Sequence, residues 1–172
     1  MSITYSAEEI FQIGIEIELN GKRFYQAAAE AEQDMDMRKL FKELADWEAG
    51  HVEVFEKLKK KLPAQSENYL PYDPEDQYHR YLKAVANTHV FIMSDNVLDL
   101  AAKCESSMDV LLMALQFEKD SIVLYTTMKK LVPEHLGRGA IDNLINEEIN
   151  HVSIISEKIK NPRPKGMALL RP

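Results

Sequence analysis

The sequence has little cysteine, glycine and proline, and each scarcity excludes a class of protein. Cys104 is the single cysteine in 172 residues, so neither an internal disulfide nor a four-cysteine iron or zinc module can form. No apolar run approaches the roughly 20 residues of a membrane span, and the N-terminus lacks the pattern of a signal peptide. A formal net charge of −7 argues against nucleic acid or an anionic membrane as a partner. We therefore expect a cytoplasmic protein.

Apolar residues recur at helical spacing over four long stretches, which predicts an all-α protein. The first helix pair is expected over residues 6–62, beginning with a capping box formed by Ser6 and Glu9. The second pair is expected over residues 107–160, with its last helix beginning near Leu136. The length suits one domain, so we predict a single four-helix bundle.

The connection between the two pairs, residues 63–106, is too long to lack structure in a compact domain. Asp73 followed by Pro74 resembles a helix start, so we expect a short helix over 75–88 and another over 97–104. The bundle domain is then residues 1–162, and the proline-rich residues 163–172 form a tail.

The two helix pairs are related by an internal repeat. A shift of 100 positions aligns polar as well as apolar residues, whereas a repeat kept only for packing would preserve the apolar ones. Each half has an inner glutamate on its first helix and a Glu-x-x-His sequence on its second. The matched residues are Glu18 with Glu118, Tyr25 with Tyr125, and Leu44, Glu48, His51, Val52 with Leu144, Glu148, His151, Val152.

These glutamates and histidines lie on apolar stripes rather than on polar faces. Glu118, for example, shares its expected inner face with Leu111, Leu115, Ile122 and Tyr125. Burying four unpaired carboxylates would cost several kcal/mol each, whereas two divalent cations would balance their charge. Mixed oxygen and nitrogen ligands suit iron or manganese, and zinc usually takes fewer ligands. The alternative is that all six residues are ordinary surface acids and histidines.

Four segments carry a resemblance to a known family: IEIELNGKRFYQAAAE, LFKELADWEAGHVEVFEKL, ALQFEKDSIVLYTTM and LINEEINHVSIISEKI. They resemble the rubrerythrin branch of the ferritin-like superfamily. The resemblance implies a ferritin-like four-helix bundle, a di-iron (Fe²⁺/Fe³⁺) site, peroxide reduction and a homodimer, with residues 63–106 as the long crossover. The metal ligands it implies are Glu18, Glu48, His51, Glu118, Glu148 and His151.

The sequence departs from rubrerythrin proper in two respects. The residues given include no four-cysteine rubredoxin domain, so electrons would come from another, rubredoxin-like protein. Ser121 stands where rubrerythrin has an additional glutamate one turn after the ligand of the third helix. Both departures weaken the inference of peroxidase activity without affecting the predicted metal site.

Other residues near the predicted site have alternative interpretations. Tyr25 and Tyr125 are expected to hydrogen-bond the ligand carboxylates and to supply an electron or a proton, or else to be core tyrosines. Glu147 does not fit the three-residue offset from His151 and is expected to be solvated. Trp47 is expected to pack, and Cys104 to be an inert buried thiol.

The sequence therefore favours a di-iron oxidoreductase that reduces peroxide or dioxygen with electrons from an external donor. An alternative is an iron-binding module for sequestration or delivery without turnover. A third is a structural bundle that holds zinc or no metal. Whether the helices pair within one chain or swap between two copies is left open.

Overall fold

The computed structural model describes residues 6–63, 75, 77–88 and 97–161, and within these ranges the chain is helical and contains no strand. The predicted all-α fold is therefore confirmed. The four long helices are α1 (Ala7–Ala31), α2 (Met35–Lys60), α6 (Ser107–Leu131) and α7 (Arg138–Lys160). The shorter ones are α3 (Gln77–Thr88), α5 (Val97–Ala102) and the 3₁₀ turn η2 (Glu134–Leu136).

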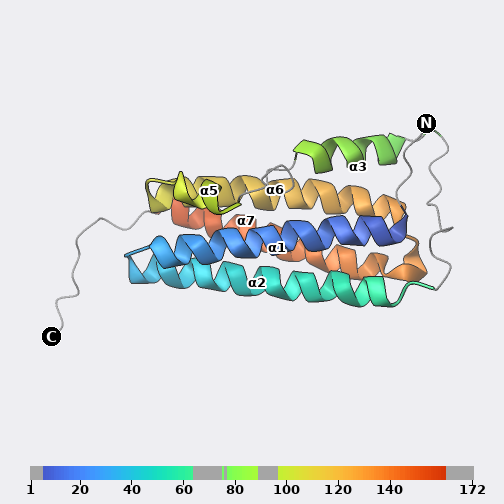
Figure 1. Cartoon of the computed structure of the whole chain (residues 1–172), viewed down its shortest axis with the longest axis horizontal. Coiled ribbons are helices and arrows are strands. Elements are labelled where there is room, and N and C mark those ends of the chain that lie inside the picture. Colours follow the sequence, from blue (N-terminus) through green and yellow to red (C-terminus); the bar gives the residue numbers. More distant parts are fainter. Residues whose placement is uncertain (1–5, 64–74, 76, 89–96, 162–172) are drawn as a thin grey trace.

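Two helical hairpins pack together to form the bundle. Helix α1 packs along α2, and α6 packs along α7, while α3 lies beside α6 and α5 lies against α1 (Figure 1). Contacts between the hairpins join α1 to α6 and α2 to α7. The bundle is thus closed by helices that are far apart in sequence. No described helix is long and apolar enough to cross a membrane.

Local sequence explains where three of the four long helices begin. The predicted capping box at Ser6 and Glu9 is present, and Asp34 and Ser106 cap the starts of α2 and α6 through their side chains. The predicted helix bounds agree with the observed ones to within one helical turn. The predicted start at Asp73 and Pro74, and the predicted tail, lie outside the described residues.

The fourth helix begins differently from the prediction. Residues Glu134–Leu136 form a separate 3₁₀ turn, and α7 starts only at Arg138. Gly137 separates the two with a φ of 111°, in the left-handed region that favours glycine. A Cβ atom at this position would also lie 2.1 Å from Leu58 Cδ2, so the Leu58 side chain would have to shift in addition to the backbone strain.

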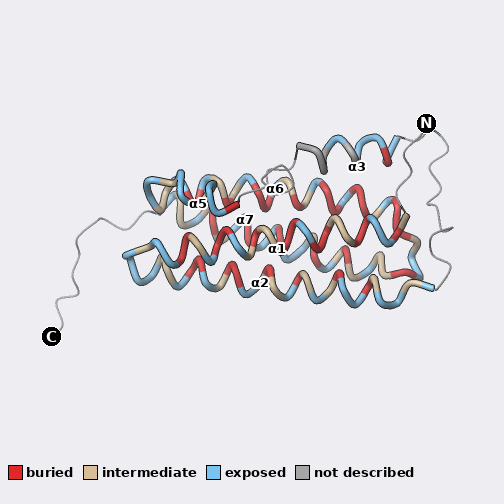
Figure 2. Tube along the Cα trace, in the orientation of Figure 1, coloured by how far each residue is buried: buried red, intermediate tan, exposed pale blue. Residues whose placement is uncertain are grey.

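The core lies between the four long helices, whose buried positions face one another (Figure 2). On α1, Gly14 allows the Phe55 ring to approach so closely that an added Cβ would lie 2.7 Å from it. On α6 the predicted inner face was partly wrong, because Leu115 and Ile122 are only half-buried. The smaller Ala114 and Ser121 are buried instead.

Candidate metal centre

The structure brings together all six residues that the sequence singled out as metal ligands. Each long helix contributes one glutamate, and α2 and α7 each add a histidine one turn later. Every one of these side chains is buried, although ionisable residues are seldom buried without partners. The residues are Glu18, Glu48, His51, Glu118, Glu148 and His151.

Their ligand atoms form two overlapping groups. One consists of Glu18, Glu48, His51 and Glu148, and the other of Glu48, Glu118 and His151; within each group the atoms lie within 4.8 Å of one another. Glu48 belongs to both groups, and Glu148 contacts both histidines, with Oε1 3.0 Å from His51 Nδ1 and Oε2 3.0 Å from His151 Nδ1, so these two carboxylates reach both halves of the cluster. This arrangement suits two neighbouring cations that share a carboxylate.

Two buried polar atoms of the cluster have no hydrogen-bond partner among the described residues, which supports a metal site. The two atoms are Glu48 Oε2 and His51 Nδ1. Nδ1 nevertheless lies 3.0 Å from Glu148 Oε1, 3.3 Å from Glu48 Oε2 and 3.5 Å from Glu18 Oε2. Buried polar atoms are rarely left unsatisfied. Carboxylate oxygens converging on an imidazole nitrogen are a donor set that fits iron or manganese.

The two tyrosines hold the inner glutamates across the bundle. The Tyr25 hydroxyl donates to Glu118 Oε1 at 2.6 Å, and the Tyr125 hydroxyl donates to Glu18 Oε1. Both predicted hydrogen bonds are thus present, each between α1 and α6. Since residue 25 meets 118 and residue 18 meets 125, these helices run antiparallel. Whether either tyrosine supplies an electron or a proton stays a prediction.

The four carboxyl groups are of two kinds: the pKa is raised for Glu48 and Glu148 and lowered for Glu18 and Glu118. Burial raises the pKa of Glu48 well above its ordinary value, and the negative charges of Glu18 and Glu118 raise it further. Burial and the charge of Glu118 likewise raise the pKa of Glu148 to about 8. Burial alone would raise the pKa of Glu18 and Glu118 too, but contacts with neighbouring carboxyl groups and a histidine, and a tyrosine hydrogen bond, lower both. Without metal, burial and repulsion therefore favour the protonated forms of Glu48 and Glu148.

The same carboxylates raise the pKa of both histidines. Burial by itself would lower the pKa of His151, but the contacts with Glu118 and Glu148 outweigh it and raise the value to about 9. The pKa of His51 is raised for the same reason, by Glu148, Glu18 and Glu48. Metal binding must therefore displace protons from the cluster.

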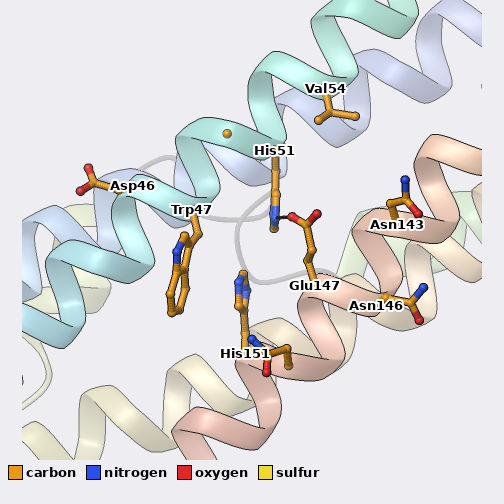
Figure 3. A pocket seen from close by; sticks show the side chains of 10 residues that line it. Asp46, Trp47, His51, Val54, Asn143, Asn146, Glu147 and His151 are labelled. Carbon is orange, nitrogen blue, oxygen red and sulfur yellow. Dashed lines mark hydrogen bonds and ion pairs between the residues drawn. The ribbon is translucent and has the colours of Figure 1, made fainter.

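An open groove of about 710 Å³ between α2 and α7 reaches both histidines (Figure 3). Glu147 lies in this groove with its Oε2 atom 3.0 Å from His51 Nε2. The expectation that Glu147 is merely solvated was therefore incomplete: its side chain is 59% exposed, yet it contacts a histidine of the cluster. No sequence pattern indicates this contact, because it joins two different hairpins.

Trp47 and Cys104 lie where packing was expected. The Trp47 ring stacks on His151, with ring centroids 4.7 Å apart and planes within 9° (Figure 3). It thus packs, but against a predicted ligand. Cys104 is half-buried, and its thiol donates to the Leu100 carbonyl oxygen.

The fold and this buried cluster define a ferritin-like helical bundle with a candidate carboxylate–histidine metal site. Residues 9–106 match the family model of rubrerythrin, and this chain belongs to the rubrerythrin family. A solved structure from Thermotoga maritima, assigned as a ferritin-like diiron-carboxylate protein, superposes with a TM-score of 0.68 at 24% identity, covering 91% of this chain and 96% of that one. No curated protein matches the chain.

Proposed function

We propose that this protein is a di-iron oxidoreductase of the rubrerythrin type, which reduces peroxide or dioxygen with electrons from an external donor. The observation that carries the proposal is the pair of overlapping donor groups that share Glu48 within a buried carboxylate cluster. Glu18, Glu48, His51 and Glu148 would hold one iron ion, and Glu118 and His151 would hold the other with Glu48.

When bound, two ferrous ions supply the two electrons that convert hydrogen peroxide and two protons into two molecules of water. The chain's own residues prepare the site for this chemistry. The tyrosine hydroxyls occupy Oε1 of Glu118 and Glu18, which leaves the Oε2 atoms for metal. Ligands held in this way by outer hydrogen bonds keep their orientation during a change of metal charge.

The protein also sets the protonation of the ligand carboxyl groups and provides a route by which an oxidant can reach them. Burial raises the pKa of Glu48 and of Glu148 in the metal-free cluster, which favours their protonated forms. Binding of cations would release these protons, and the negative charge of each carboxylate would then offset part of the positive charge of the ions. The groove between α2 and α7 gives a small oxidant a route to the histidine edge of the cluster.

The proposal also includes an electron donor, an oligomeric state and a compartment. Electrons would come from a rubredoxin-like protein, and the functional unit would be a homodimer in the cytoplasm. Reduction of the oxidised protein by a purified rubredoxin would test the first point, and light scattering would test the second.

The test of the activity is anaerobic loading with two equivalents of Fe²⁺, followed by peroxide or by dioxygen. Fast two-electron oxidation, with repeated turnover when a reductant is present, is expected. Slow oxidation in which dioxygen outpaces peroxide, without turnover, would refute the enzyme proposal. The variant carrying both Glu48→Ala and Glu148→Ala should bind no iron pair, and an unchanged stoichiometry would show that the site is misassigned.

A second candidate function is iron binding without turnover, for sequestration or delivery. It is favoured by Ser121, which is buried on α6 one turn after Glu118 and offers no carboxylate at the position where rubrerythrin has an additional glutamate. Elemental analysis of the native protein would separate iron from the alternatives, manganese and zinc.

A further inference from the structure

The contacts of the cluster obey an approximate two-fold symmetry, and one departure from it changes the chemistry around a histidine. Adding or subtracting 100 converts the contact of Tyr25 with Glu118 into that of Tyr125 with Glu18, and both are present. The same operation converts the contact between His51 and position 147 into one between His151 and position 47. Position 147 is glutamate, whereas position 47 is tryptophan.

Glu147 places a carboxylate on the outer edge of one histidine. Its Oε2 lies 3.0 Å from His51 Nε2, while Nδ1 of the same ring faces three glutamates of the cluster. A carboxylate at Nε2 keeps the proton on that nitrogen and leaves the Nδ1 lone pair for a metal ion. It also makes the imidazole a stronger ligand.

Trp47 acts differently on the other histidine. It covers the face of the His151 ring at a centroid distance of 4.7 Å, which fixes the plane of the ring. An indole offers an N–H donor and no acceptor, so it cannot accept a hydrogen bond from a His151 N–H, whereas the Glu147 carboxylate can accept one from His51 Nε2. His51 is therefore oriented by a contact with a carboxylate, and His151 by stacking on an aromatic ring, although the two contacting residues occupy symmetry-related positions.

We propose that Glu147 is a positioning residue that makes the two metal positions unequal, so that the position at His51 binds its divalent cation first and more tightly. The carboxylates point in the same direction, since three glutamates lie within 3.5 Å of His51 Nδ1, whereas two, Glu118 and Glu148, lie within 3.5 Å of His151 Nδ1. The inference rests on the proposed function in one respect, namely that the six buried residues hold two metal ions.

The test is a titration of the metal-free protein with Co²⁺, followed by its visible absorption. The wild-type protein is expected to show two resolved binding steps. Glu147→Ala should weaken the tighter step about 10- to 100-fold, the usual loss when the outer partner of a metal-bound histidine is removed, and leave the weaker step unchanged. Glu147→Gln should restore part of the loss, because its amide oxygen can still accept the Nε2 proton.

The matched control is Asp46→Asn, which removes one negative charge from the same groove without altering a contact to a histidine. It should leave both steps unchanged. Equal weakening by Asp46→Asn and Glu147→Gln would show that only the charge of the groove matters, and would overturn the proposal.

Histidine ¹⁵N NMR of the protein with two equivalents of Zn²⁺ gives an independent readout. The His51 Nε2 proton should exchange slowly in wild type and quickly in Glu147→Ala, with the His151 signals unchanged. A slow His51 proton in Glu147→Ala would overturn the proposed contact. Two wild-type binding steps of equal affinity would refute the inequality but leave the metal site intact, whereas no Co²⁺ binding would refute the site itself.

Discussion

Replacing Glu48 by glutamine should stabilise the metal-free protein and at the same time destroy its response to metal. Glu48 is 4% exposed, its Oε2 has no hydrogen-bond partner among the described residues, and burial with the charges of Glu18 and Glu118 raises its pKa well above the ordinary 4.5. In the unfolded chain the same group ionises normally. Folding at a pH between the ordinary pKa of 4.5 and the raised one therefore takes up a proton at Glu48.

The proton that Glu48 takes up on folding makes the free energy of unfolding depend on pH. A group with a raised folded-state pKa contributes stability that is fully present below its unfolded pKa and is lost as pH rises, at about 1.4 kcal/mol per pH unit. Between the ordinary pKa and the raised one, wild type should thus lose at most about 1.4 kcal/mol per pH unit relative to Glu48→Gln. For a chain of this size, 1 kcal/mol corresponds to about 2–4 °C in melting temperature.

The assay is urea unfolding with a chelator at several pH values, repeated with saturating Co²⁺. Wild type should gain about 2.7 kcal/mol at a metal concentration 100 times its Kd, and Glu48→Gln should gain much less. The control Glu53→Gln changes an exposed acid on the same helix and should stay within about 0.5 kcal/mol at every pH. A metal-free Glu48→Gln protein that is no more stable than wild type at pH 7.5, or a difference that does not grow with pH, would refute the reasoning.

Three further predictions concern other parts of the molecule. Tyr25→Phe removes the donor to Glu118 and should cost about 1–3 kcal/mol of unfolding free energy; in urea unfolding, no loss would show that the hydrogen bond is unimportant. Gly137→Ala forces a side chain into a left-handed φ of 111° and should cost at least about 1 kcal/mol, so an unchanged melting temperature would contradict the turn geometry. Co²⁺ affinity should rise with pH up to about 8–9, because Glu148 and His151, with pKa values raised to about 8 and about 9, must lose protons to bind; calorimetry showing a pH-independent affinity would disprove the coupling.

Much of the fold and the placement of the six buried residues followed from the sequence because both depend on local patterns. Helical spacing and caps such as Ser6 depend on neighbours in the chain, and the 100-residue repeat placed Glu-x-x-His on matched helices. The left-handed turn at Gly137 was missed, because a single glycine does not reveal its φ angle. Similarly, the inner face of α6 was partly misplaced, since Ile122 is as apolar as the residues that are actually buried.

The sequence by itself thus determined that polar residues of both helix pairs belong to one buried cluster, because only ligands or partners can offset their burial. The tertiary structure alone decided how the pairs meet. It paired Tyr25 with Glu118, set Glu147 against His51, and stacked Trp47 on His151. Each of these contacts joins two hairpins, and the antiparallel packing of whole helices, which no local pattern encodes, determines which side chains face one another.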